Sequence, residues 1–458
     1  MESKKGLRWI VSISLILFLG GTFVPSILAK KPKKPTPTPS PVTLAERNII
    51  TFEGGKERLT VWGLTGDNDY SNIWTAEDVI YSSLAIGDID GIGTREIVGA
   101  RYCKLYEGKR NGPYFYKAFI NVYREKEEGV EDGIWTTTYY EDSNNISEPD
   151  SPLGSELILN DVDGNGINEI VMLTTTHLAV YKFNSDVNDV YTQALQKIAD
   201  CQLSSGDLRE GTEVWLRLQS MSVGDIDNDR NKEIIAVGHL VSISNNMGYV
   251  FIYNLSGPDT NGEYYLTEKQ KIEVPYNFSK NSLRAGDLDG DGLIEFCSTA
   301  YSQSGTYPND SYTQYLLVWD DYENGGAWDN PYVYQINPGD TTYQMNYMDI
   351  GNLDDNPNQD EIAVLLRSAD ELVTYSWSPS GLTEMNRINL DSSIAINRIA
   401  IGDSNNDSAN EIVIGGYKKV RNKQVLYLAT YDKNFSLLWE KIDSNGTAVH
   451  SLAVDKKI

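Results

Sequence analysis

The feature that most constrains how this chain folds is a segment that occurs six times. Each copy contains a short apolar run, an acidic turn, and a second apolar run such as EIV. The acidic turns begin at Asp88, Asp161, Asp225, Asp287, Asn352 and Asp403. Repetition at intervals of roughly 50–70 residues indicates a series of similar units, each of which buries its apolar face against its neighbours.

A second pattern recurs between the acidic turns, and it occurs seven times. It is an alternating apolar strand pattern with an aromatic end, and the seven ends are Trp62, Tyr123, Tyr181, Tyr253, Trp319, Tyr375 and Tyr431. Most copies are followed by a further strand pattern with polar and aromatic residues, as in YYLTEKQKIEV. Four strands per unit, with almost no helical periodicity, are typical of a β-propeller blade.

The two ends of the chain explain why six turns accompany seven strand patterns. The final residues, HSLAVDKKI, match the first strand of a unit, and the segments NIITFEGG, RLTVWGL and NIWTAEDVIYS supply the remaining strands. We therefore expect residues 451–454 to join the N-terminal strands in one shared blade, which leaves no open seam in the ring. The sequence predicts an all-β, seven-bladed β-propeller of four-stranded antiparallel blades, with six or eight blades as alternatives.

The N-terminal residues predict export from the cell. Lys4, Lys5 and Arg8 precede an apolar run that ends at Ala29, which is the pattern of a secretory signal peptide or a signal-anchor. We expect three parts: the signal peptide or anchor (1–29), a Pro/Thr-rich linker (30–45) and the propeller (46–458). The protein is then secreted or at the cell surface, and it contacts a membrane only through an uncleaved N-terminal anchor.

The charge balance excludes some classes of partner. Asp and Glu total 65 against 39 Lys and Arg, which gives a net charge of −26. Nucleic acids and anionic lipids are bound by clustered Lys and Arg, so we expect neither as a partner, whereas cations suit so acidic a surface. Cys103, Cys201 and Cys297 lie far apart and form no C-x-x-C motif, so they are expected to be buried small residues or to form at most one disulfide.

The acidic turns have the chemistry of a calcium loop. In the fourth copy, oxygen-bearing side chains fall at positions 1, 3, 5 and 9, with a glycine at position 6 for the tight turn. Calcium is bound by six to eight oxygen atoms, and alternate residues of a turning loop converge on one point. The acid at position 9 and the flanking strands distinguish the loop from an EF-hand. Asp-Gly and Asn-Gly also favour plain hairpin turns, but six copies that keep the acid favour calcium.

The six copies are not equivalent. The predicted metal ligands are Asp88, Asp90 and Glu96; Asp161, Asp163, Asn165 and Glu169; Asp225, Asp227, Asp229 and Glu233; Asp287, Asp289, Asp291 and Glu295; Asn352, Asp354, Asn356 and Asp360, with Glu361 as the alternative acid; and Asp403, Asn405, Asp407 and Glu411. Arg230 and Ser408 replace the glycine in the third and sixth copies. Ile92 and Pro357 interrupt the first and fifth copies, so the sites at Asp88 and Asn352 are expected to be the weakest of up to six calcium sites.

The repeated core, GD-h-D-x-[DN]-G-x-x-E-[IV], resembles the FG-GAP/VCBS repeat family, which forms the blades of the integrin α-subunit propeller and of its microbial relatives. The resemblance covers about residues 47–458. It implies that each calcium loop joins the first and second strands of a blade on one face of the disc. It also implies that ligands dock on the opposite face, where the Tyr-rich segments 102–116 and 301–315 are candidates.

The expected function is a secreted or cell-surface adhesion module that binds an extracellular protein or glycan, with structural calcium and without enzyme activity. A lectin is one alternative, in which Trp135, Trp328 and Trp377 stack on sugars; these residues could equally pack between blades. The enzymatic alternative resembles the calcium-propeller rhamnogalacturonan lyases, although no separate catalytic constellation is visible. The His residues, His177, His239 and His450, are expected to be ordinary strand or surface residues.

Overall fold

The computed structural model describes residues 47–454 of the chain, apart from several internal segments. The omitted segments are 67–68, 77–82, 94, 107–113, 124, 127–128, 131–139, 143–155, 175–176, 184–194, 204–214, 242–245, 306–310, 321–327, 329, 337–345, 355, 368 and 406. The predicted signal segment and linker, Trp135, and parts of both Tyr-rich segments lie outside the described residues.

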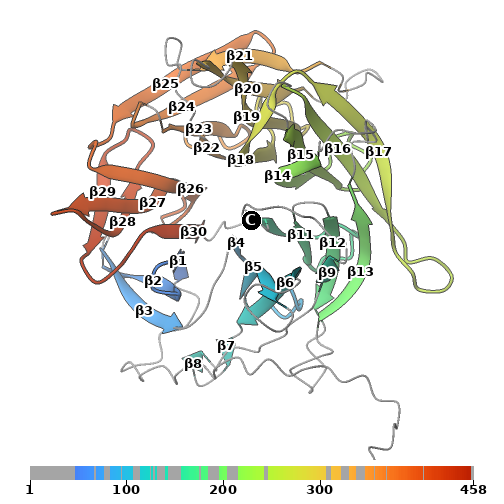
Figure 1. Cartoon of the computed structure of the whole chain (residues 1–458), viewed down its shortest axis with the longest axis horizontal. Coiled ribbons are helices and arrows are strands. Elements are labelled where there is room, and N and C mark those ends of the chain that lie inside the picture. The colour runs from blue at the N-terminus through green and yellow to red at the C-terminus, as the bar shows by residue number, and fades with distance from the viewer. Residues whose placement is uncertain are drawn as a thin grey trace, which may run out of the picture.

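Seven four-stranded antiparallel sheets are arranged as blades around a central axis (Figure 1). Blade 1 contains β4 (Ser83–Gly87), β5 (Glu96–Tyr106), β6 (Tyr114–Tyr123) and β9 (Tyr140–Asp142), with a small β7 (Glu125–Lys126) and β8 (Gly129–Val130) hairpin beside it. Blade 2 contains β10 (Glu156–Asn160), β11 (Glu169–Leu173), β12 (His177–Phe183) and β13 (Leu195–Gln202). Blade 3 contains β14 (Trp215–Gly224), β15 (Glu233–Val241), β16 (Gly248–Ser256) and β17 (Tyr265–Val274).

The other blades have the same strand order, counted from the axis outward. Blade 4 contains β18 (Asn277–Gly286), β19 (Glu295–Ser304), β20 (Ser311–Trp319) and β21 (Tyr332–Ile336). Blade 5 contains β22 (Tyr347–Gly351), β23 (Glu361–Leu366), β24 (Glu371–Ser378) and β25 (Gly381–Asn389). Blade 6 contains β26 (Ile394–Gly402), β27 (Glu411–Val420), β28 (Lys423–Tyr431) and β29 (Leu437–Asp443). Blade 7 contains β30 (Val449–Val454), β1 (Arg47–Glu53), β2 (Arg58–Gly66) and β3 (Asp69–Ala76).

Blade 7 is the predicted shared blade. The C-terminal strand β30 pairs antiparallel with the N-terminal strand β1, with Ile50 opposite Ala453 and Phe52 opposite Ser451. Each innermost strand contacts the innermost strand of the next blade, and β30 contacts both β26 and β4, so the ring is closed. The predicted seven-bladed propeller with joined chain ends is therefore confirmed.

The core lies between neighbouring blades. All six residues of β23 are buried, whereas β25 in the same blade is largely half-buried or exposed. A middle strand is covered on both faces by adjacent blades and therefore has a continuous apolar sequence, while the outermost strand faces solvent. Phe296 stacks on Trp319 with ring centroids 4.8 Å apart. Among the described residues, no helix has the length and apolarity that crossing a membrane requires.

Two of the three tryptophans considered for sugar stacking belong to this core. Trp328 and Trp377 are 5% and 1% exposed, so their faces pack against protein and not against a ligand. His177 and His239 are buried strand residues, as expected. Cys297 is also buried, and both it and the half-buried Cys201 are free thiols.

Candidate functional site

The six acidic turns, numbered loop 1 to loop 6 in chain order, connect the first and second strands of blades 1 to 6. Every innermost strand except β30 runs directly into one of these loops. Because the innermost strands occupy equivalent positions around the ring, the loops gather on one face of the disc. They are also linked to one another: Asn168 donates a hydrogen bond to the Asp88 carbonyl, and Asn410 donates one to the Asn352 carbonyl.

The acid that begins each second strand makes the same hydrogen bond in all six loops. Its Oε2 atom accepts the backbone N–H of the residue at position 2. The donor and acceptor pairs are Ile89 and Glu96 (3.0 Å), Val162 and Glu169 (3.1 Å), Ile226 and Glu233 (3.0 Å), Leu288 and Glu295 (2.6 Å), Leu353 and Glu361 (2.6 Å), and Ser404 and Glu411 (2.8 Å). One carboxylate oxygen of each of these acids thus holds the turn.

The first acid of the loop closes the turn by accepting the N–H of position 6. The distances are 2.9 Å from Gly93, Gly166 and Gly292 to Asp88, Asp161 and Asp287, 3.0 Å from Arg230 to Asp225, and 3.1 Å from Ser408 to Asp403. All five donors have a left-handed backbone, and the φ angles of Arg230 and Ser408 are 75°. The same turn therefore forms in loops 3 and 6 without glycine, at a cost in backbone strain.

Loop 5 differs from the others by one inserted residue, and this decides which acid is equivalent to the other ninth-position acids. Glu361 Oε2 accepts the Leu353 N–H, which is the same hydrogen bond that the ninth-position acid makes in the other loops, and Asp360 does not make it. The backbone N–H of Asp360 instead donates to the Asp287 carbonyl, at 2.6 Å. Asp360 therefore faces the preceding loop, and of the two acids offered by the sequence the structure places Glu361 in the loop interior.

Four loops bring three carboxylates within 4.8 Å of one another. The groups are Asp88, Asp90 and Glu96; Asp161, Asp163 and Glu169; Asp225, Asp227 and Asp229; and Asp287, Asp289 and Asp291. Asn165, Glu233, Glu295 and the predicted ligands of loops 5 and 6 are outside these groups. Loop 1 has such a group although Ile92 interrupts it. The described residues thus contain four carboxylate clusters in which a metal ion could be held.

The electrostatics of these clusters suit a cation. Burial, together with the neighbouring charges of Asp289, Asp287 and Asp291, raises the pKa of Glu295 to about 9. Burial likewise raises the pKa of Glu169, Glu233, Glu361 and Glu411 to about 7. The Oε1 atoms of Glu295 and Glu361 are buried and have no hydrogen-bond partner among the described residues. A buried carboxylate oxygen without a donor beside it fits a hard cation such as Ca²⁺.

Two loops contain a positive charge supplied by the protein. The ammonium group of Lys182, on β12, contacts Asp163 and lies 3.8 Å from Glu169 Oε1 in loop 2. Lys269, on β17, contacts Asp227 and lies 3.1 Å from Glu233 Oε1 in loop 3. Within the described residues, no ammonium or guanidinium group pairs with the carboxylates of loop 4.

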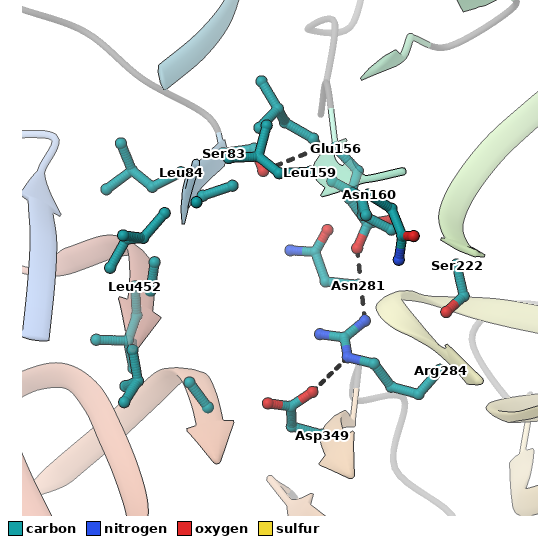
Figure 2. A pocket seen from close by; sticks show the side chains of 18 of the residues that line it. Ser83, Leu84, Glu156, Leu159, Asn160, Ser222, Asn281, Arg284, Asp349 and Leu452 are labelled. Atoms are coloured by element: carbon teal, nitrogen blue, oxygen red, sulfur yellow. Dashed lines mark hydrogen bonds and ion pairs between the residues drawn. The ribbon is translucent and has the colours of Figure 1, made fainter. Parts of the chain in front are cut away.

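The innermost strands also enclose a cavity of about 650 Å³ at the centre of the ring (Figure 2). Side chains alternate along a strand, so the residues five and three positions before the first loop acid point the same way. In blades 1 and 3 these residues are small: Ser83 and Ala85, and Ser220 and Ser222. In the other blades these positions include five charged or bulky residues that line the cavity: Glu156, Arg284, Tyr347, Asp349 and Arg398.

Some of these residues connect one blade to the next. The Ser83 hydroxyl accepts the Leu157 N–H at 3.0 Å, and Ser220 accepts the Leu283 N–H at 3.0 Å. Glu156 is equivalent in position and accepts the Met221 N–H at 2.6 Å. Each bond satisfies a backbone donor on the free edge of an innermost strand.

The charged residues of the cavity form a network across four blades. Arg284 Nε donates to Asp349 Oδ1 at 2.5 Å, and its Nη1 atom lies 3.6 Å from Glu156 Oε1 (Figure 2). Asp349 Oδ2 accepts the Ile401 N–H at 2.8 Å. Burial raises the pKa of Glu156, and the nearby Arg284 opposes that rise. Sequence reasoning missed these residues. Their signal is the substitution of charged or bulky residues at positions that hold Ser or Ala in other repeats.

Comparison with known proteins establishes the fold. No family model matches the sequence, and no curated protein matches it. A solved structure from Lactobacillus plantarum is similar over 90% of this chain and 100% of its own, with a TM-score of 0.53 and 13% identity. A candidate 6-phosphogluconolactonase from Bacteroides fragilis is similar over 91% and 100%, with a TM-score of 0.50 and 14% identity.

The rhamnogalacturonan lyase of Bacillus licheniformis has 12% identity over 89% of this chain and 69% of its own, and its TM-score of 0.33 is too low to support an argument. At these identities the first two likenesses show the propeller fold alone. The expectation that the chain is not an enzyme therefore gains no support from the comparisons, and both possibilities are taken up below.

Proposed function

We propose that this chain is an exported propeller of the FG-GAP/VCBS type, in which structural calcium holds the acidic loops. The propeller (46–458) would follow a signal peptide or anchor (1–29) and a linker (30–45). It would serve as a binding module for an extracellular protein or glycan, in solution or at the cell surface. The observation that carries the proposal is the set of six acidic loops with one hydrogen-bond pattern on one face, four of them with clustered carboxylates.

Calcium in this proposal stabilises the fold. Extracellular modules bind calcium with dissociation constants of about 10⁻⁴–10⁻³ M. Calcium at ten times the dissociation constant stabilises each site by roughly 1.4 kcal/mol. Without the ion, three carboxylates within 4.8 Å repel one another in each of four loops.

The calcium part of the proposal predicts that excess chelator lowers the melting temperature of the full chain by at least about 5 °C, since several sites contribute together. Differential scanning calorimetry with and without EGTA measures the change, and readdition of calcium, but not of magnesium, should restore the original value. Asp287→Asn, in the loop without a lysine partner, should reduce the response to EGTA. A melt that EGTA leaves unchanged would refute a structural role for the metal.

A second candidate function is a polysaccharide lyase, and one observation favours it. Lys280 is next in sequence to Asn281, which lines the central cavity, and burial together with the charges of Arg398 and Arg217 lowers the pKa of Lys280 to about 7. A partly neutral amine next to a guanidinium can remove the proton beside a uronate carboxylate. The carbanion charge is stabilised by the cation, a C=C bond forms as the glycosidic C–O bond breaks, and the departing sugar oxygen takes up the proton that the amine removed.

Affinity electrophoresis of the full chain through a panel of polysaccharides, with calcium present, distinguishes the candidates. Retardation by one class of glycan without a change in the polymer supports a glycan-binding module. Retardation together with new ultraviolet absorbance from C=C bonds supports the lyase. If no glycan retards the chain, a protein ligand becomes the better proposal.

A further inference from the structure

Three basic side chains on the innermost strands lie close enough for their charges to interact, and one of them, Arg398, lines the central cavity. Arg398 is on β26, Lys280 on β18 and Arg217 on β14, and none of them forms an ion pair within the part of the chain that the structure describes. Arg398 lines the cavity, where its guanidinium lies 5.4 Å from the centre of the Tyr347 ring. In a chain with a net charge of −26, a group of unpaired cations at the axis requires an explanation.

An irregular segment of β18 carries Lys280 to this position. The pairing of β18 with β19 passes from Phe278 opposite Ala300 to Leu283 opposite Ser298, so residues 279–282 bulge out of the ladder. Asn281, next to Lys280, has a φ of 52° and lines the cavity. Figure 2 shows Asn281 close to the Glu156 and Arg284 pair. Bulges of this kind redirect side chains and are common beside binding sites.

Buried hydroxyl groups hold the bulge in place. Ser282 Oγ donates to the Ser279 carbonyl at 2.8 Å, and Ser220 Oγ accepts the N–H groups of Ser282 and Leu283, each at 3.0 Å. Ser220 and Ser282 are both 0% exposed. The position of Lys280 is therefore built into the scaffold, as a preorganised site requires.

Among the residues that the structure describes, the acids that line the cavity already have other partners. Asp88 accepts backbone N–H groups of its own loop, and Glu156 and Asp349 are shared by Arg284 and by backbone N–H groups. His450 is on β30, the innermost strand next to β26. Burial lowers the pKa of His450, and the charges of Arg398 and Lys280 lower it as well. Like charges that are held together in a partly desolvated cavity are unfavourable until an anion joins them.

The remaining lining indicates what kind of anion fits. Asn160, Ser222 and Asn281 offer neutral hydrogen-bonding groups on the same cavity wall (Figure 2). A cavity of about 650 Å³ is within the range of small-ligand pockets. The planar fork of an arginine matches the oxygens of a carboxylate or a phosphate. We propose that the central cavity binds a small hydroxyl-rich anion, a sugar that bears a carboxylate or a phosphate, through Arg398 and Lys280.

This inference deepens the proposed function, because it names a site and a ligand class for a glycan-binding or glycan-cleaving propeller. A sugar carboxylate and a sugar phosphate both present negatively charged oxygens, and the choice of probe distinguishes the two. Isothermal titration calorimetry of the full chain in calcium-containing buffer would use galacturonate, glucose 6-phosphate, inorganic phosphate, and the neutral sugars galactose and glucose. We expect a charged sugar to bind, and galactose and glucose not to bind detectably.

Two substitutions test the residues. Arg398→Met and Lys280→Met should each weaken binding of the charged sugar at least tenfold. Lys423→Met removes an exposed lysine at the start of β28 and should leave the affinity unchanged. Lys280→Met is expected to keep or raise the melting temperature, because it removes a charge close to two like charges, so the folded state of the variant can be verified.

The inference is overturned if the folded chain binds none of the charged probes, if neutral sugars bind as tightly, or if both variants keep the original affinity. Binding of inorganic phosphate and glucose 6-phosphate with equal affinity would also contradict it, because the hydroxyl groups would then contribute nothing. An EGTA-insensitive melt refutes the calcium proposal alone and leaves the titration valid. Loss of stability in EGTA without anion binding refutes this inference alone.

Discussion

Position 6 of loops 1 to 4 and of loop 6 shows how a single residue sets the energy of a turn. The turn needs a left-handed residue whose N–H reaches the first acid, and glycine takes that conformation without a Cβ penalty. Gly292 has a φ of 91°, and a Cβ built on it would have no atom within 4 Å. Any effect of a substitution there comes from the backbone conformation and not from a collision.

Gly292→Ala should therefore destabilise the chain by about 1–2 kcal/mol, which is the usual cost of the left-handed conformation for an L-residue. The reverse change in loop 3, Arg230→Gly, should stabilise it slightly, since relief of strain is partly offset by the greater chain entropy of glycine when unfolded. Denaturant unfolding in calcium measures both. Equal stability of Gly292→Ala and the unmodified chain would show that the turn does not depend on this conformation.

At the scale of elements, the loops and their neighbouring strands form one connected layer. Gln359 of loop 5 donates to the Leu288 carbonyl of loop 4 at 2.8 Å. Lysines from the third or fourth strand reach the carboxylates of loops 2 and 3. In the proposed calcium sites of these two loops, an ammonium group would be a weaker substitute for the divalent cation and would compete with it for the same oxygens.

Lys182→Met should tighten calcium binding in loop 2, because the carboxylates of Asp163 and Glu169 lose a competing charge. A partly exposed ion pair is worth about 0.2–1 kcal/mol, which corresponds to an increase in affinity of up to roughly fivefold. Calcium titration calorimetry measures the effect. The matched control is Lys197→Met on β13, whose ion pair with Asp200 lies on an outer strand. Weaker calcium binding in Lys182→Met would mean that the lysine supports the site.

At the scale of the whole molecule, the ring depends on the pairing of its two ends. Val449 is completely buried, and β30 contacts the innermost strands on both sides as well as β1. The shared blade thus replaces a seam between two open sheet edges with a continuous ladder and core. The same closure holds the innermost strands at one distance from the axis and so creates the central cavity.

Removal of residues 449–458 should open the ring, because it exposes the edge of β1 and the apolar faces of blades 6 and 1. We expect a fall in melting temperature of more than about 10 °C, or loss of cooperative unfolding. Scanning calorimetry and light scattering measure stability and aggregation. Removal of 455–458 alone leaves β30 complete and is expected to keep the original melt. A truncated chain as stable as the full one would contradict the role of blade 7.

Much of the architecture could be predicted from the sequence because its signals are local. The alternation of a strand extends over a few residues, each acidic turn is contiguous, and the match between the two chain ends follows the same repeat. The acid of loop 5 shows the limit of this approach. Asp360 and Glu361 are adjacent, and only the register of β23 against β22, with Glu361 opposite Gly351, determines which side chain enters the loop.

By itself, the sequence determined the all-β class, the seven blades, the shared blade and the places of the acidic loops. The tertiary structure alone decided the central cavity. Glu156, Arg284, Asp349 and Arg398 belong to four different blades, and each is an isolated departure within its own repeat. A repeat pattern identifies which face of a strand points to the axis. Closure of the ring brings these distant residues together, because it sets which innermost strands face one another across the cavity.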